Sequence, residues 1–276
     1  DHSITALGIT TDTRKIKQGD IFVAIKGENF DGHDFIDKAF ELGAVCVFSQ
    51  IEKIPPQGKA IILVDDTIKA FGSLAAYYLE KNRIPVVAVT GSVGKTTTKD
   101  IISSVLSQKY DVLKTQGNFN NHLGLPITIF NMTDKNNAAV LEMGMNNFGE
   151  ISYLSSIAKP DIAVITNVGV SHIENLGSRE GILKAKCEIF DYINKNGKAI
   201  LNGDDDMLIT MEGKLPVEVI WFGVENHKGI YAKNIKPIGI EKIQCDIITN
   251  QGCFNVIIPV PGNHMVLNAM AATSVG

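Results

Sequence analysis

The stretch from Val86 to Asp100 constrains the fold of this chain more than any other part of the sequence. It opens with the apolar, largely β-branched run 86–89, which predicts a short buried strand. Gly91 and Gly94 follow, and they allow a tight turn whose backbone N–H groups point inward. From Thr96 onward the spacing predicts a helix. The apolar face of that helix consists of Ile101, Ile102, Val105 and Leu106.

This order of strand, glycine turn, Lys-Thr pair and helix is typical of a phosphate cradle. The residues of the cradle are Gly91, Ser92, Val93, Gly94, Lys95, Thr96 and Thr97. Their backbone amides and the helix N-terminus supply a positive dipole, Lys95 supplies a full charge, and Thr96 can offer its hydroxyl to Mg²⁺. The general pattern wants a further glycine at position 89, where this chain has Val89. The alternative is an ordinary glycine turn with a surface lysine, but the flanking strand and helix favour the cradle.

Length and composition indicate a globular protein of two domains. The chain has 276 residues, of which 45% are hydrophobic and 20% charged, and a net charge of −4. The charge gives no broad basic surface for nucleic acid or an anionic membrane, and no apolar run is long enough for a membrane span. The N-terminus lacks a signal-peptide pattern, and the four scattered cysteines are typical of reduced thiols, so we predict a cytoplasmic protein. The missing initiator Met and the unterminated last helix predict a fragment of a longer protein.

Residues 1–83 are predicted to form a small α/β domain. Strands are expected at 21–25, 44–48 and 60–64, and helices at 34–42 and 71–80. The first helix should turn Phe35, Ile36, Ala39 and Phe40 inward and end at Gly43. The run 81–85 is the expected domain boundary.

Polar clusters at 10–14 and 26–33 lie within this first domain. The hydroxyl of Thr13 beside Arg14, together with a glycine-rich loop, suits a phosphate or diphosphate. A capped turn with a solvated Arg14 explains the first cluster equally well. The residues leave both interpretations open.

Residues 84–276 alternate apolar strands with helices. Strands are expected at 86–89, 138–141, 162–165, 199–201 and 217–221, which predicts a doubly wound, mainly parallel sheet. Polar residues repeatedly follow the strands, where ligands of such sheets bind. These residues are Lys95, Glu142, Asn167, His172 and Asn202.

The polar residues differ in how strongly they indicate a site. Glu142 suits Mg²⁺, which takes one or two carboxylates beside phosphate oxygens, and the alternative is a strand-end glutamate in a local salt bridge. His172 alone is weak, because a lone histidine is usually structural and imidazole is an uncommon ligand for a hard cation. The run 204–206 of three aspartates is more typical of a solvated turn than of a metal site. Taken alone, Lys184 and Lys186 are most simply residues on the solvent-exposed face of an amphipathic helix.

Two asparagine-rich stretches complete the list of candidate sites. The stretch 116–126 is too polar and glycine-rich for regular structure and could border a substrate, with Asn118 and Asn121 as its candidate contacts. The stretch 262–268 opens the final helix. Asn268 has the donors and acceptor for an adenine edge, although the first turn of a helix would use Asn equally well.

Together these residues resemble the Mur ligases, the ATP-dependent amino-acid ligases of peptidoglycan precursor synthesis. The motifs that carry the resemblance are Thr90-Gly-Ser-Val-Gly-Lys-Thr-Thr-Thr, Leu-Glu142-Met-Gly, Thr-Asn167-Val-Gly-Val-Ser-His172, Ala-Lys186-Cys-Glu-Ile-Phe and Gly-Asn-His264-Met-Val-Leu-Asn268. Within the family the chain is most similar to the ligases that add D-alanyl-D-alanine to UDP-MurNAc-tripeptide. His122 and Met145 depart from their usual pattern, which has an acidic residue and Thr at these positions.

The resemblance implies a mechanism. A substrate carboxylate attacks the γ-phosphate of ATP, and the amine of D-alanyl-D-alanine displaces phosphate from the acyl phosphate. Lys95 and the loop would hold the phosphates, Thr96 and Glu142 one Mg²⁺, and His172 would help with a second. The resemblance also implies a carbamylated Lys186, a catalytic residue together with Lys95, Glu142 and His172.

The resemblance further implies a domain plan. Residues 1–83 would bind the UDP-sugar substrate, through Thr13 and Arg14 among others, and 84–276 would form the central ATP-binding domain. A C-terminal domain is absent from this chain, so we expect little activity from it alone. The parent enzyme is expected to be a monomer that serves cell-wall synthesis, cell shape and cell division.

Other functions remain open at this point. They are the related ligase that adds the third amino acid, a P-loop kinase or NTPase, and a module that only docks a nucleotide-sugar. The sequence does not distinguish lysine from diaminopimelate as the third residue of the tripeptide.

Overall fold

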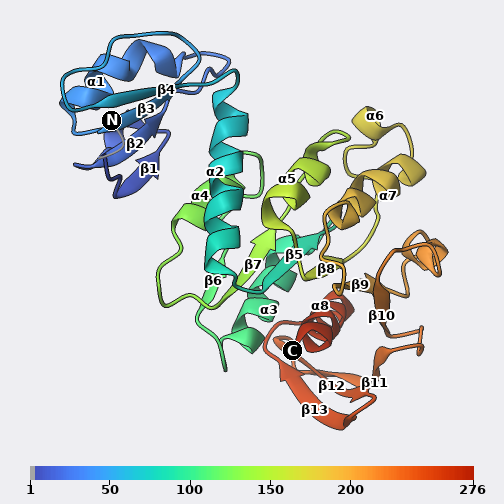
Figure 1. The fold of residues 1–276 in the computed structure, drawn as a ribbon. Coiled ribbons are helices and arrows are strands. Elements are labelled where there is room, and N and C mark those ends of the chain that lie inside the picture. The colour runs from blue at the N-terminus through green and yellow to red at the C-terminus, as the bar shows by residue number, and fades with distance from the viewer. Residues whose placement is uncertain (1–3) are drawn as a thin grey trace. The chain divides into compact units, whose positions relative to one another are not determined.

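The computed structural model describes residues 4–276, which divide into two compact units. The first unit comprises Asp1–Lys81 and Ile129–Asn131, and the second comprises Asn82–Thr128 and Met132–Gly276. Figure 1 shows both units as a ribbon coloured along the chain. None of the helices in the described range has the length and apolarity that a membrane span requires.

The first unit contains a four-stranded parallel sheet of order β1-β2-β3-β4. Its strands are β1 (Gly8–Thr10), β2 (Asp20–Val23), β3 (Cys46–Ser49) and β4 (Ala60–Leu63). Its helices are η1 (Thr13–Lys15), η2 (Gly32–Phe35), α1 (Ile36–Glu41) and α2 (Thr67–Asn82), of which η1 and η2 are 3₁₀ helices. The expected α/β character of this segment is therefore correct.

The helix expected at 34–42 is shorter than predicted. It begins as the 3₁₀ helix η2, whose last residue Phe35 is 40% exposed instead of facing inward. Ile36, Ala39 and Phe40 do lie in the core, as their helical spacing predicted. Gly43 follows the end of α1 with φ +114°, a conformation that favours glycine.

The second unit is built on a nine-stranded sheet of order β13-β12-β11-β10-β9-β8-β5-β7-β6. The parallel strands are β5 (Val86–Thr90), β6 (Val112–Lys114), β7 (Ala138–Glu142), β8 (Ile162–Ile165), β9 (Lys198–Asn202) and β10 (Glu218–Gly223). The strand β11 (Ile230–Ile238) continues the parallel order, and β12 (Lys242–Thr249) and β13 (Gly252–Ile258) add antiparallel pairs. The sequence predicted five of these strands and missed β6 and the three at the end.

Helices cover both faces of this sheet, so the unit is doubly wound, as expected (Figure 1). They are α3 (Lys95–Leu106), α4 (Gly124–Phe130), α5 (Glu150–Ala158), α6 (Ile173–Leu176), α7 (Arg179–Cys187), α8 (Asn263–Val275) and the 3₁₀ helices η3 (Glu188–Phe190) and η4 (Leu208–Met211). One core cluster joins alternate strand residues such as Val87, Val89 and Val140 to Ile102 of α3 and Met270 of α8.

Two details of the helices differ from the prediction. Val105, expected on the buried face of α3, is 38% exposed, while Ile102 is fully buried. The asparagine-rich stretch expected to lack regular structure is irregular only up to Leu123, because α4 begins at Gly124. The side chain of Asn121 accepts hydrogen bonds from the N–H groups of Leu123 and Gly124, and it thereby starts that helix.

Candidate functional site

The carboxyl ends of the parallel strands place the predicted polar residues at one edge of the sheet. In the register Val89 lies opposite Glu142, and Thr90 lies opposite Ile165. The backbone continues the pairing beyond the strands, since Met143 N donates to Val89 O at 2.9 Å and Thr166 N donates to Thr90 O at 3.0 Å. Glu142 and the segment after β8 therefore share the edge of the glycine loop, as the strand pattern predicted.

Glycine is required where β5 ends. Gly91 has φ +155°, and a Cβ atom there would lie 1.9 Å from Thr166 Oγ1. Gly94 has φ +80° and directly precedes α3. The loop can follow this path only because both residues lack a side chain. It delivers the free N–H groups of the first turn of α3, Lys95 to Thr97, to the sheet edge.

The tip of the loop is held by the segment after β8. Ser92 N donates to Asn167 O at 3.1 Å, and Val93 N donates to Asn167 Oδ1 at 2.9 Å. The carbonyl of Val93 accepts from Asn167 Nδ2 at 2.9 Å and from Thr166 Oγ1 at 2.8 Å. Because the N–H groups of Ser92 and Val93 are bonded to Asn167, they are not available to a phosphate in this conformation, and the cradle role of residues 91–97 stays a prediction.

The side chain of Lys95 folds back onto the glycine loop. Its Nζ donates to Gly91 O at 2.9 Å. Burial lowers the pKa of Lys95 below its usual value, and the negative charge of Glu142 opposes part of that shift. The ammonium group is therefore aimed at the loop and is within electrostatic reach of Glu142.

Glu142 carries a carboxylate oxygen that has no partner in the described chain. The residue is 2% exposed. Asn120 Nδ2 donates to Oε1 at 2.8 Å, whereas Oε2 is buried and accepts no hydrogen bond. A buried, unpaired carboxylate oxygen is costly, and a hard cation is the partner that it suits best. Asn120 is a site residue that the sequence analysis missed, and only its place in the asparagine-rich stretch pointed to it.

Lys186 lies inside the protein, not on a wet helix face. It is 2% exposed, while Lys184 on the same helix is exposed. Burial, reinforced by the positive charge of Lys95, lowers the pKa of Lys186 to about 7. The structure thereby separates the two lysines that the sequence left equivalent.

His172, in the segment after β8, and Thr96, in the first turn of α3, belong to no preformed metal cluster among the described residues. His172 has φ +65°, is exposed and precedes α6. Thr96 is exposed in the first turn of α3. Within residues 4–276, no three His, Cys, Asp or Glu side chains are grouped as a metal site would require. The metal roles of His172 and Thr96 stay predictions.

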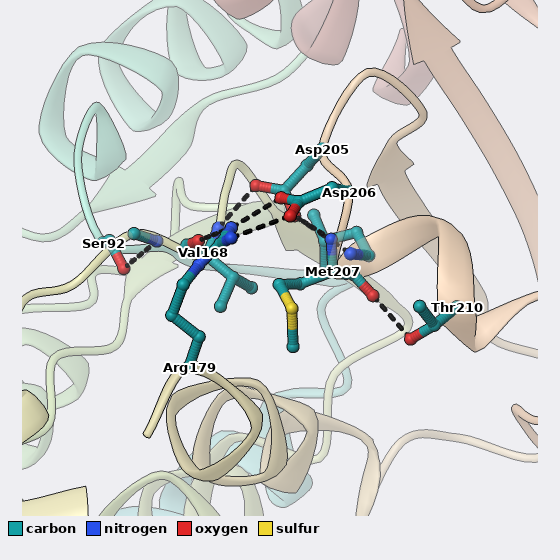
Figure 2. Close-up of polar contacts among 9 residues, drawn as sticks. Ser92, Val168, Arg179, Asp205, Asp206, Met207 and Thr210 are labelled. Carbon is teal, nitrogen blue, oxygen red and sulfur yellow. Dashed lines mark hydrogen bonds and ion pairs between the residues drawn. The ribbon is translucent and has the colours of Figure 1, made fainter. Parts of the chain in front are cut away.

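The aspartates at 204–206 form a turn, but their carboxylates are not simply solvated. Asp204 accepts from the N–H groups of Val224, Glu225 and Asn226. Asp205 accepts from Val168, and Asp206 is paired with Arg179 (Figure 2). The expected turn is therefore present, and its carboxylates also contact the segment after β8, the start of α7 and the residues after β10, which no local pattern shows.

The asparagines predicted as ligand contacts have different surroundings. Asn268 is 8% exposed, and its Oδ1 accepts from Thr98 Oγ1 at 3.0 Å. Its Nδ2 faces the sulfur of Met265 at 3.8 Å. The hydrogen bond between Asn268 and Thr98 thus connects α8 to α3 next to Gly94. Asn118 is exposed in the loop before α4, and Asn121 is the exposed cap of that helix.

A cavity of about 360 Å³ opens next to this edge of the second unit. It is lined by Asn121, His122, Gly144, Phe148, Gly149, Glu150, Tyr153 and Leu154. Gly144 follows Glu142 by two residues, and its N–H donates to Asn120 O at 2.8 Å. Met145, the other unusual residue, is buried at 7% exposure and does not line the cavity.

In the first unit, Thr13 and Arg14 form the 3₁₀ helix η1. Arg14 is fully outward, with its side chain 87% exposed, and pairs with Asp12 through two hydrogen bonds of 2.9 and 2.8 Å. These bonds lower the pKa of Asp12 to about 2. In the second polar cluster His33 is buried, contacts Asp31 at 2.5 Å and accepts from Gln50 N at 3.0 Å. That histidine organises the fold and is not available to a ligand.

Comparison with protein families matches both parts of the chain. The description "Mur ligase middle domain" applies to residues 89–276, and "Mur ligase family, catalytic domain" applies to residues 5–93. The chain is 44% identical to the UDP-N-acetylmuramoyl-tripeptide--D-alanyl-D-alanine ligase of Bacillus subtilis, over 98% of this chain and 58% of the relative. The chain therefore spans less than two thirds of that relative's length.

Solved structures of two other proteins have a similar fold. MurF from Acinetobacter baumannii superimposes with a TM-score of 0.90 at 36% identity, covering 96% of this chain and 58% of the other. The MurF ligase from Thermotoga maritima in complex with ADP superimposes with a TM-score of 0.90 at 33% identity, covering 99% of this chain and 62% of the other.

Proposed function

The chain belongs to the Mur ligase family, and from that premise we propose that the full-length protein is an ATP-dependent ligase that joins D-alanyl-D-alanine to UDP-MurNAc-tripeptide. Relatives and a structural neighbour whose names state a D-alanyl-D-alanine ligase support the proposal. The observation that carries it is the buried, unpartnered Glu142 Oε2 on the same sheet edge as Lys95 and the glycine loop.

The nucleotide site of this proposal is the first turn of α3. The N–H groups of Lys95, Thr96 and Thr97 point out of the helix N-terminus, where anions are favoured. Lys95 Nζ rests on Gly91 O at 2.9 Å, a weak anchor that it can leave for a phosphate oxygen. A substrate carboxylate would attack the γ-phosphate of ATP held here, which needs positioning and charge neutralisation more than covalent chemistry. The ADP bound to one structural neighbour supports a nucleotide as a ligand of this chain.

Glu142 and Thr96 would hold Mg²⁺. The donor set fits, since Mg²⁺ takes hard oxygen ligands and is usually bound by one or two carboxylates with phosphates and water. Mg²⁺ supplies charge neutralisation to the phosphate oxygens when bound. Asn120 would orient Glu142 by its bond to Oε1 and leave Oε2 free for the ion. His172 is exposed in the segment after β8 and would contribute to a second ion site.

Lys186 would carry a carbamate. Its neutral amine attacks CO₂, a C–N bond forms, and one proton leaves to solvent. Burial supports this step because it favours the neutral amine at neutral pH. The product converts the neutral amine into a carbamate whose negative charge lies within reach of Lys95, so this attraction favours it. Incorporation of ¹³C-labelled CO₂, followed by NMR, tests it, and the Lys186→Met variant should show no label.

The remaining assignments concern substrates and setting. Arg14 and Thr13 would bind the UDP end of the muramyl peptide in the first unit, after Arg14 exchanges Asp12 for phosphate. Asn118 and Asn121 would contact substrate beside the 360 Å³ cavity. Asn268 would support the nucleotide site through Thr98. We assign the protein to the cytoplasm as a monomer in cell-wall synthesis, and its free cysteines support a reducing compartment.

The test is substrate dependence in the protein restored to full length. Multiple-turnover ADP release should require both UDP-MurNAc-tripeptide and D-alanyl-D-alanine, and the product should contain a new amide. ADP release without either substrate would instead identify an NTPase. A phosphorylated product without an amide would identify a kinase. Use of a single amino acid with the muramyl dipeptide would identify the ligase that acts one step earlier.

A further inference from the structure

Val168, the second residue after Thr166 in the segment that follows β8, has both of its backbone polar groups held by side chains. It is 1% exposed. Its N–H donates to Asp205 Oδ2 at 2.8 Å, and its carbonyl accepts from Arg179 Nη2 at 2.9 Å (Figure 2). Arg179 belongs to the start of α7, whereas Asp205 belongs to the turn after β9. Two separate elements therefore hold the backbone on both sides of this one residue.

Both of these side chains are themselves fixed. Arg179 forms a two-bond pair with Asp206, with Nη1 at 2.7 Å from Oδ2 and Nη2 at 2.5 Å from Oδ1. Such bidentate pairs add geometric specificity. Asp205 Oδ1 accepts from the N–H groups of Met207 and Leu208 at 3.0 and 2.9 Å. The anchors of Val168 are thus held in place before any ligand arrives.

The other side of this segment contacts the glycine loop. Gly169 N donates to Ser92 Oγ at 2.9 Å. Asn167 bonds the backbone of Ser92 and Val93 three times, through its O, Oδ1 and Nδ2 atoms. A Cβ at Gly169 would lie 3.3 Å from Ser92 Cβ, so the two backbones approach closely. Residues 167–169 form a bridge from Arg179 and Asp205 to the loop tip.

We propose that Arg179 is a positioning residue that holds residues 167–169 against Ser92 and Val93 and thereby sets the shape of the loop leading into Gly94. The inference deepens the proposed function, and only its nucleotide-binding arm rests on that function. The pair with Asp206 is exposed, with side chains 35% and 70% accessible. An exposed pair contributes little to global stability, so its effect should be local.

The first test is amide hydrogen exchange in the nucleotide-free 276-residue chain. In Arg179→Met the N–H groups of Ser92 and Val93 should exchange about tenfold faster, since a lost charged hydrogen bond is worth about 1.5 kcal/mol or more. Lys228→Met is the matched control, because Lys228 forms an exposed pair with Glu212 at 2.6 Å that does not contact the segment after β8. Asp206→Asn keeps the bond from Arg179 to Val168 and should give a smaller increase.

Unchanged exchange at Ser92 and Val93 in Arg179→Met overturns the proposal, and so does an equal increase in the Lys228→Met control. If Arg179→Met does not fold, Asp206→Asn against the same control decides the question: faster exchange at Ser92 and Val93 supports the proposal, and no change contradicts it.

The second test is MgATP affinity by calorimetry on the same chain. Arg179→Met should raise the dissociation constant about tenfold relative to Lys228→Met, at similar unfolding midpoints, and Arg179→Lys should recover part of the loss because one donor remains. Equal affinity in Arg179→Met and the control would mean that the bridge does not shape the site. If the unsubstituted chain binds no MgATP, the nucleotide site of the proposed function fails, and hydrogen exchange alone decides the role of Arg179.

Discussion

The lowered pKa of Lys186 comes from its surroundings and not from its being a lysine. Lys184 lies on the same helix, yet it is exposed and places its ammonium 5.8 Å from the ring of Phe148. Lys186 is buried beside the charge of Lys95, and both effects favour its neutral form. A helix places residues two positions apart on different faces, so only one of the two lysines can face the core.

The lowered pKa of Lys186 predicts a pH dependence of stability. Between the folded pKa of about 7 and the ordinary value of 10.5, the unfolded chain binds more protons than the folded chain. The free energy of unfolding therefore rises with pH across this window and falls as the pH is lowered towards 7. Lys186→Met removes this dependence. Relative to the unsubstituted chain, the variant should gain about 2–3 kcal/mol on going from about pH 9 to about pH 6.

Denaturant unfolding in CO₂-free buffer measures this difference. Lys184→Met is the control, because Lys184 is exposed and no comparable pH effect is expected from it. Parallel pH profiles for the unsubstituted chain and Lys186→Met would contradict the burial-driven pKa.

Lys95 is the residue whose loss should matter most to activity. Lys95→Met removes the positive charge that would neutralise the transferred phosphate, so ligation by the full-length protein should fall by about 10²–10³-fold or more. Lys109→Met is the control, since Lys109 is an exposed lysine just beyond α3. Initial rates of amide formation measure the effect. Retention of activity in Lys95→Met would favour a binding module over an enzyme.

At the scale of elements, β5, the glycine loop and α3 act as one unit of structure. The strand is buried throughout, the helix packs Ile102 into the core, and the loop between them has no room for a side chain at Gly91. The close contact comes from Thr166, which continues the neighbouring strand β8. The shape of the loop therefore depends on sheet pairing as well as on its own sequence.

Gly91→Ala tests this dependence. The new Cβ would lie 1.9 Å from Thr166 Oγ1 at a φ of +155°, so strain and overpacking should together lower the free energy of unfolding by about 2–5 kcal/mol. MgATP binding should be lost as well, because the loop must move.

Gly117→Ala separates backbone strain from overpacking, the two effects expected in Gly91→Ala. Gly117 has φ +52°, and a Cβ atom added there would meet nothing within 4 Å, so only backbone strain of about 1–2 kcal/mol is expected. Chemical denaturation measures both variants. Similar losses at the two glycines would show that the contact with Thr166 is unimportant.

At the scale of the whole molecule, each unit has its own hydrophobic core. The first is centred on Phe22, Ile36 and Val47, and the second on residues such as Val89, Ile102 and Met270. The proposed nucleotide site lies wholly within the second unit. A nucleotide that binds there stabilises that unit directly.

Trp221, the single tryptophan, reports on the second unit alone. It is buried at 7% exposure in β10. At MgATP about 100 times the dissociation constant, the unfolding transition seen by Trp221 fluorescence should gain about 2.7 kcal/mol. Hydrogen exchange in β2 should not slow by the same amount. An equal gain for Lys95→Met would place the nucleotide elsewhere.

Much of the fold follows from local pattern. The parallel strands of the second unit were predictable because runs such as 138–141 and 162–165 are apolar on both faces and are bounded by turns. β12 and β13 were missed because their outward residues are polar or scattered and their stability comes from pairing with each other. Phe35 was placed wrongly because the chain enters α1 through a 3₁₀ turn, which rotates it outward.

For the candidate site, the positions of its residues on the sheet edge were predictable and their contacts were not. The glycine spacing and the strand ends indicated where Lys95 and Glu142 would lie, because the carboxyl ends of parallel strands share an edge. Asn120 and Arg179 were missed, since each acts on a residue that is distant in sequence.

The sequence by itself determined the order of strand, glycine turn and helix, the doubly wound sheet and the residue types at its edge, because these depend on side-chain periodicity and on the conformational freedom of glycine. Only the tertiary structure decided which amides of the loop are free, which lysine is buried and which carboxylate oxygen lacks a partner. Those properties depend on desolvation and on contacts between segments far apart in the chain, and local sequence encodes neither.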